Sequence, residues 1–203
     1  MLNILGKEYP SRLDELTVDQ WERIGNIYAK EQDAETKQGA TLCFVEIFRE
    51  LGVPEKDLLE LRRMPEAVFN DAVKKFDADT KQECEVVKEI ELKGYRYACP
   101  LHNGDIFLTP EKRALINEKF SKRAKSGNFA YMMAVLFERT DLTPTEHYTK
   151  AHIEHKSELF KELKASVVAP VVFAFMKYNY DIMKAEKQAL EDENSGELAG
   201  GND

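Results

Sequence analysis

The chain has 203 residues and a net charge of −8, with 43% apolar and 33% charged residues. This composition is typical of a helical protein with a real core, and the length allows one domain or two small ones. The longest apolar run, residues 167–176, contains Pro170 and is too short to span a bilayer. The N-terminus lacks the basic and then apolar order of a signal peptide, so we expect a protein that stays in the cytoplasm and contacts no membrane.

Two short alternating runs open the chain over residues 2–10 and predict a β-hairpin that turns at the Gly6-Lys7 pair. A Leu-Thr pair then begins a helical pattern, in which Thr17 and Gln20 have the spacing of a capping box. Trp21 lies on the apolar face of this helix, and we expect it to be largely buried.

Prolines and threonines mark the later helix starts. Pro54 and Pro65 are expected in the first turns of two short helices, at about 54–62 and 65–76. Thr109 and Thr143 are each followed by a proline suited to the first helical position.

The C-terminal part of the chain combines a long helix with a polar tail. Thr143 and Glu146 form a second capping-box pattern, and a last helix would have to take Pro170 in its first turn. From Asn194 onward the sequence offers too little apolar surface to offset the entropy of ordering, so we predict a disordered acidic tail over 194–203.

The order of elements repeats along the chain. Residues 90–98 resemble residues 2–10, and a second Leu-Thr pair at 108–109 begins the next helix. Further matches join Phe48 to Phe137 and the helix around Phe69 to that around Phe160. We predict an internal duplication into residues 1–88 and 89–193. Chance similarity between amphipathic helical stretches is the alternative.

The predicted fold is therefore mainly α, with roughly nine helices and two short hairpins in two similar halves. An isolated two-stranded hairpin is marginal in water, so the hairpins are expected to pair with each other or to lie across helices. Pairing, which we favour, would build one pseudo-symmetric domain, whereas separate hairpins would build two lobes.

Histidines on the helix after Thr143 are the strongest candidate metal ligands. His152 and His155 stand three residues apart and can share one helix face, which Glu158 extends. His147 lies too far around the helix to join them, and a closed site would need further ligands, for which His102 and Asp105 are the evident candidates. A solvated face rich in Glu, Lys and His is the simpler interpretation, so we predict no metal site.

Other catalytic patterns are absent from the sequence. The three cysteines, Cys43, Cys84 and Cys99, are widely spaced and form no Cys-x-x-Cys pair, which argues against a disulfide framework or a zinc ribbon. Cys99 and His102 lack an orienting third group, and there is no Gly-x-Ser-x-Gly elbow and no phosphate-binding glycine loop. We therefore predict a non-enzymatic protein with no catalytic residues and no cofactor.

One segment is strongly basic. Between Lys112 and Lys125 there are six cations and one acid, with Phe120 and Phe129 nearby as possible stacking groups for nucleic acid. Because Phe120 falls on the apolar face of its helix and the protein is acidic, we expect the cations to serve internal pairs or a protein partner. We predict no nucleic-acid binding.

The opening Leu-Asn-Ile-Leu-Gly-Lys-Glu-Tyr-Pro, followed by Leu16, Thr17, Gln20 and Trp21, resembles small accessory proteins of tailed bacteriophages, including tail-assembly chaperone-like proteins. The resemblance covers about 30 residues and carries over no site residues. It implies a virion assembly or structural protein that contacts other phage structural proteins or itself. The implied location is the host cytoplasm during assembly, and the mature virion is a second location that the resemblance allows. A metal-dependent enzyme or metal-binding protein using His152 and His155 is the alternative function.

Overall fold

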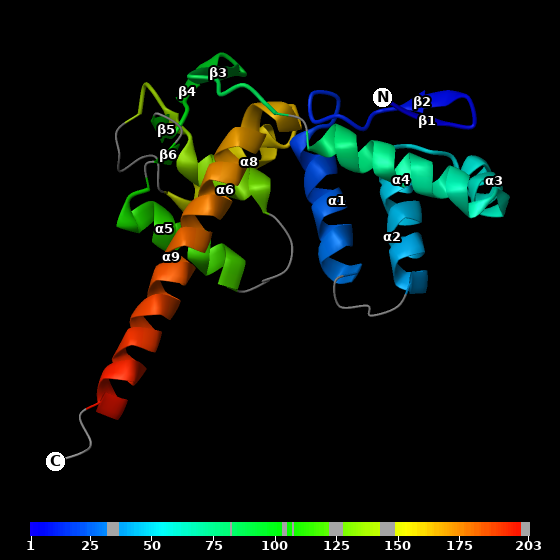
Figure 1. Cartoon of the computed structure of the whole chain (residues 1–203). Helices are drawn as coiled ribbons and strands as arrows, with labels where there is room; N and C mark the ends of the chain where they lie inside the picture. Colours follow the sequence, from blue (N-terminus) through cyan, green and yellow to red (C-terminus); the bar gives the residue numbers. More distant parts are fainter. Residues whose placement is uncertain are drawn as a thin grey trace.

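The computed structural model describes residues 1–31, 37–81, 83–102, 105–106, 108–121, 128–142 and 149–199. These residues form eight helices and a few short antiparallel strand pairs, which confirms the predicted mainly α fold. The elements fall into an N-terminal group and a C-terminal group that lie side by side, at right and left in Figure 1.

The N-terminal group is a hairpin packed on four helices. Strand β1 packs against α4, while α1 and α2 pack against each other. Its elements are β1 (Leu2–Ile4), β2 (Lys7–Tyr9), α1 (Val18–Glu31), α2 (Lys37–Glu50), α3 (Glu55–Arg63) and α4 (Glu66–Thr80).

The C-terminal group combines helices with two small sheets. Helix α6 packs against α5, α8 and α9, and α9 runs past the rest of the molecule toward the C-terminus (Figure 1). The strands are β3 (Glu89–Leu92), β4 (Tyr95–Ala98), β5 (Leu101–His102), β6 (Asp105–Ile106) and β7 (Glu138–Arg139). The helices are α5 (Pro110–Ser121), α6 (Phe129–Leu136), α8 (Lys150–Phe160) and α9 (Ala165–Ala199).

Several predicted helix starts are confirmed. The Thr17 hydroxyl accepts a hydrogen bond from the Gln20 N–H at 3.2 Å, and the Gln20 side chain accepts one from the Thr17 N–H at 3.0 Å, which is the reciprocal capping box. The Lys112 N–H donates to the Thr109 hydroxyl at 3.3 Å, ahead of Pro110. The pattern at Thr143 and Glu146 lies outside the described residues.

The start of the last helix differs from the prediction. Pro170 lies inside α9 and not in its first turn, because α9 already begins at Ala165. The backbone of α9 continues to Ala199, and the disorder expected over 194–203 stays a prediction, with residues 200–203 outside the described residues. Extension of an existing helix avoids the unfavourable nucleation step, so a polar segment can continue it at low cost. No described helix has an apolar run long enough to cross a bilayer.

The two hairpins share one turn geometry. Leu5 and Gly6 have φ of 53° and 79°, and Lys93 and Gly94 have φ of 52° and 79°. Positive φ at both central residues is the mark of a type I′ turn, which fits the twist of a two-residue hairpin. Tyr9 and Tyr97 are buried at matching places in the two hairpins. This likeness supports the duplication, which stays a prediction.

The expected pairing of the two hairpins with each other is wrong. Strand β1 pairs only with β2, whereas β4 pairs with both β3 and β7 in a three-stranded sheet. Strand β7 follows α6 directly and occupies the edge of β4, and the N-terminal hairpin instead buries Leu2 and Ile4 beside α4.

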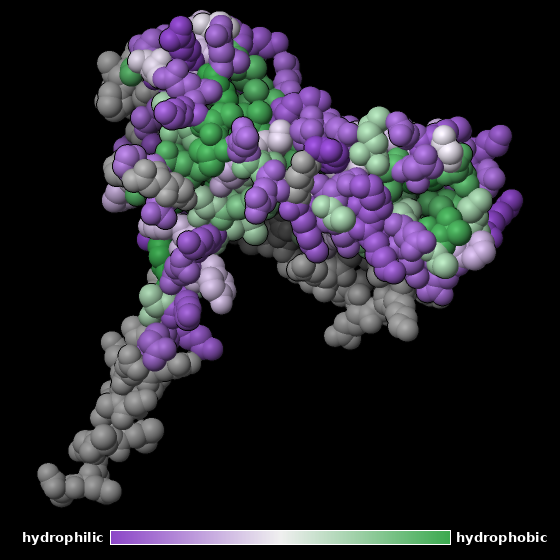
Figure 2. All heavy atoms as spheres, turned by 45° about the horizontal axis from the view of Figure 1, so that its top comes forward, coloured by the Kyte–Doolittle hydropathy of each residue, from purple (hydrophilic) through white to green (hydrophobic). Residues whose placement is uncertain are grey.

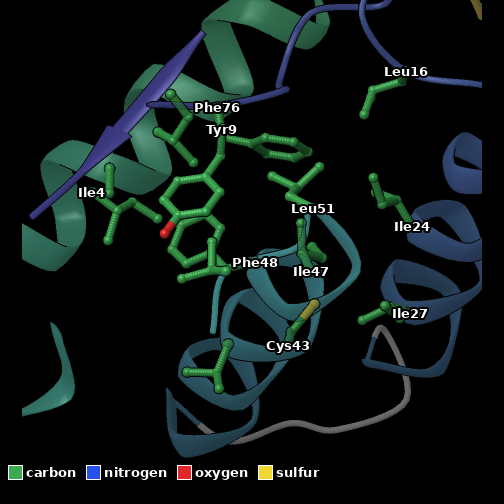
Figure 3. Packing of buried hydrophobic residues seen from close by; sticks show 14 of the residues in the cluster. Ile4, Tyr9, Leu16, Ile24, Ile27, Cys43, Ile47, Phe48, Leu51 and Phe76 are labelled. Carbon is green, nitrogen blue, oxygen red and sulfur yellow. The ribbon is translucent and has the colours of Figure 1, made fainter. Parts of the chain in front are cut away.

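Two hydrophobic cores result. In the first, Ile4 and Tyr9 from the hairpin meet Phe48 from α2 and Phe76 from α4, as Figure 3 shows. In the second, Tyr97 and Phe137 pack their rings against Phe160, with centroids 5.4 Å and 5.6 Å away. Seen from above, hydrophobic side chains gather over each group with hydrophilic side chains between them (Figure 2).

The groups are joined where α1 and α9 begin. The Val18 N–H donates to the Leu163 carbonyl at 2.8 Å, and the Ala165 and Ser166 N–H groups donate to Leu16 and Leu13 at 2.9 Å. Val18 belongs to the second core, while Ala165 belongs to the first. We call this set of contacts the junction.

Trp21 lies beside the junction, where its side chain is partly buried. It packs against both cores instead of filling one.

We expect Phe48→Ala and Phe137→Ala each to lower the free energy of unfolding by about 3–5 kcal/mol, because each removes a fully buried ring from one core. Chemical denaturation followed by circular dichroism measures this loss. Leu59→Ala, at an exposed position on α3, is the control and should cost less than about 1 kcal/mol. A loss below about 1 kcal/mol for either Phe variant would show that its core is not packed as described.

Candidate functional site

A polar cleft lies where α1, the start of α6 and α8 meet. Its volume is about 500 Å³. It is lined by Glu22, Asn128, Ala130, Tyr131, Glu154, His155, Ser157, Glu158 and Lys161. Because α1 comes from the N-terminal group and α8 from the C-terminal group, the cleft spans both.

Glu22 is the buried acid of this cleft. The Ala130 N–H, in the first turn of α6, donates to its Oε1 at 2.6 Å. The positive end of the α6 dipole and this N–H favour the carboxylate. Burial disfavours it more strongly and raises the pKa of Glu22 to about 7, against the opposing effects of the Ala130 hydrogen bond and the Lys161 charge. Glu22 therefore links the two groups through a proton-dependent contact.

The candidate metal ligands do not all come together, although His155 and Glu158 line the same cleft. His155 lines the polar cleft, whereas His102 pairs with Asp105 across β5 and β6 and lines a different cavity. His152 lies on α8 away from the cleft lining, and His147 is outside the described residues. Among the residues that the structure describes, no group of three or more His, Cys, Asp or Glu side chains could hold a metal ion.

Cys99 and His102 line a second cavity of about 260 Å³, together with Lys112 and Glu138. Burial raises the pKa of the Cys99 thiol, although the Leu101 N–H opposes this effect. A raised thiol pKa reduces the thiolate that a nucleophile needs. This environment favours a structural thiol.

The basic segment begins inside the protein. Lys112 is buried, and its Nζ lies 2.7 Å from the Glu138 carboxylate. Nearby, the buried Lys156 donates to the Phe137 carbonyl at 2.8 Å, at the C-terminal end of α6, and burial lowers the pKa of Lys156 to about 8. Lys122, Arg123 and Lys125 lie outside the described residues. The first cation of the segment is thus used within the fold, as the sequence interpretation expected.

Aromatic side chains gather next to the junction. The Trp21 ring lies 4.6 Å from that of Phe129 and 6.0 Å from that of Phe173, measured between centroids. These rings come from α1, α6 and α9. Phe173 is nevertheless 48% exposed, so the cluster reaches the surface.

An apolar stripe continues from Phe173 along α9. Its exposed fractions are 48% for Phe173, 58% for Met176, 66% for Tyr180 and 67% for Met183. The spacing of three, four and three residues places all four on one helix face. The adjoining face is buried, with Val168, Val172 and Phe175 in the second core. We call Phe173, Met176, Tyr180 and Met183 the α9 stripe.

The sequence analysis missed this stripe. It described the last helix only by the place of Pro170, although these four residues follow the 3–4 spacing of one helix face. Two apolar faces on one helix were the signal that could have found it.

No protein-family model matches this sequence, and no curated protein or solved structure matches it either.

The pKa of Glu22 predicts a pH-dependent stability. Between its ordinary value of 4.5 and about 7, the folded protein holds a proton that the unfolded chain releases, so the free energy of unfolding falls as pH rises through this window. The expected fall is about 3 kcal/mol. We expect Glu22→Gln to match the native chain at pH 4 and to exceed its stability at pH 8, in urea unfolding at both pH values.

Glu60→Gln, at an exposed position on α3, is the control and should show the same pH dependence as the native chain. If the difference in stability between Glu22→Gln and the native chain is constant from pH 4 to pH 8, Glu22 does not titrate in this window.

Proposed function

We propose that this chain is a non-enzymatic virion assembly or structural protein of a tailed bacteriophage, acting through protein–protein contacts in the host cytoplasm. The observation that carries the interaction role is the α9 stripe, four large apolar side chains in a row on a helix that extends beyond the fold. Contiguous exposed apolar surface of this kind marks interaction sites in soluble proteins. The bacteriophage setting is supported by the resemblance of residues 1–21.

The polar cleft supports a catalytic role less well than the α9 stripe supports an interaction role. Its acid, Glu22, is engaged by the Ala130 N–H, and Lys161 is engaged by Glu158 at 2.8 Å. The Ala130–Glu22 contact joins the two groups, which is a structural task, while the Lys161–Glu158 pair is a local contact at the end of α8. We accordingly place the function on the helix surface and not in the cleft.

We expect the protein to form a stoichiometric complex with the product of a neighbouring capsid, portal or tail gene when the two are co-expressed. Tyr180→Glu should abolish the complex, because it places a charge in the middle of the stripe. Size-exclusion chromatography with light scattering gives the stoichiometry.

The matched control is Ala185→Glu, which adds the same charge to the same helix at an exposed position on another face. If Tyr180→Glu and Ala185→Glu bind equally well, the stripe is not the contact surface. If the neighbouring genes encode metabolic enzymes, the assembly role fails.

Elemental analysis separates this proposal from the metal-binding alternative. We expect purified protein to contain no stoichiometric zinc, iron or manganese, and His155→Ala to keep the native thermal midpoint. Stoichiometric metal that is lost in His155→Ala would favour the alternative.

A further inference from the structure

We propose that the α9 stripe binds an acidic amphipathic helix of another protein. This inference rests on the proposed function and specifies the chemistry of its partner. The shape of the stripe, the charge at its edge and the aromatic cluster at its end each support it.

The shape fits a helix. The stripe has the 3–4–3 spacing of a and d positions in a coiled coil, with Phe173 and Tyr180 at a and Met176 and Met183 at d. From Phe173 to Met183 it is about 15 Å long, because a helix rises about 1.5 Å per residue. A row of side chains this long and one residue wide matches about three turns of a partner helix.

Two lysines beside the α9 stripe favour acidic residues on the partner helix. Lys177 and Lys184 both occupy position e, one heptad apart, and both are exposed. Among the described residues neither of them forms an ion pair, although Asp181, at position b, lies one helical turn from each of them. Position e lies beside the apolar seam and meets the flanking residues of the partner helix, so carboxylates there would be favoured.

A second copy of the chain supplies no such carboxylates to these lysines. In an antiparallel pair, position e of one helix faces position e of the other, which brings the lysines of both copies together. In a parallel pair, position e faces position g, and Lys184 and Lys177 would face Asn179 and the buried Val172. Neither symmetric arrangement is complementary, so the partner is a different protein.

The aromatic cluster provides an anchor at the N-terminal end of the stripe. Trp21, Phe129 and Phe173 form a rigid edge that is partly open to solvent. Buried aromatic side chains with few rotamers are frequent binding hot spots. Trp21 is also the only tryptophan of the chain, so its emission reports on this end of the stripe.

Two designed helical peptides test the proposal on the full chain. Both have three heptads with leucine at a and d, and one has glutamate at e and g while the other has lysine. Like charges at e and g keep each peptide from pairing with itself. Fluorescein anisotropy of the peptide and Trp21 emission are measured in the same titration. We expect the glutamate peptide to bind at least tenfold more tightly than the lysine peptide.

Two variants locate the contact. The double variant Lys177→Glu, Lys184→Glu should reverse the preference between the peptides, and Tyr180→Glu should abolish binding of both. Ala185→Glu should behave as the native chain. Circular dichroism confirms that each variant is folded.

Equal binding of both peptides, or no binding of the glutamate peptide, would overturn the proposal. A dimer in solution that Tyr180→Glu dissociates would also overturn it, because a second copy would then occupy the stripe. Binding to phosphatidylglycerol vesicles that Tyr180→Glu abolishes would also overturn the proposal, because a lipid surface would then occupy the stripe. If the peptide test fails while a neighbouring gene product binds through Tyr180, the partner class is wrong and the proposed function stands.

Discussion

The antiparallel backbone contact between residues 13–18 and 163–166 is the constraint on which the rest of the structure depends. Its hydrogen bonds fix where α1 and α9 begin. They also place Val18, the first residue of α1, in the second core and Ala165, the first residue of α9, in the first core. Backbone groups buried at such a place need partners, and this pairing supplies them without any further strand. The same contact brings Trp21 beside Phe129 and Phe173, and Glu22 to the first turn of α6.

The junction also determines what α9 exposes. Because α9 begins there, its first turns are enclosed by both cores, and its later turns contact the C-terminal group on one side only. Apolar residues on the open side gain less from folding than core residues, since about half or more of their surface stays in water. Four large apolar side chains at helical spacing on that side make sense when a partner buries them. The interaction role that we propose therefore depends on the part of α9 that extends beyond the cores.

Local physics made much of the fold predictable from sequence. The type I′ hairpins follow from the Gly6 and Gly94 turns, and the capping box of Thr17 with Gln20 follows from side-chain chemistry within four residues. Contacts between residues far apart in the sequence were not predictable in this way. Strand β7 is two residues long and gains its pairing only because α6 ends beside β4, and Pro170 falls inside α9 because the junction sets the helix start. The α9 stripe could not be predicted for the same reason, because only the long-range packing of α9 distinguishes its buried apolar face from its exposed one.

Site-specific photo-crosslinking in the cell that naturally expresses the protein tests the central claim most directly. A photoreactive amino acid would replace Tyr180 in the stripe or, as a control, the highly exposed Lys150 of α8. The account predicts that Tyr180 captures one protein, identified by mass spectrometry as a virion or assembly protein, through a segment with an acidic amphipathic helix pattern, and that Lys150 does not. Capture of the same protein from both positions, or of none from Tyr180, would contradict the claim that the α9 stripe is a docking surface.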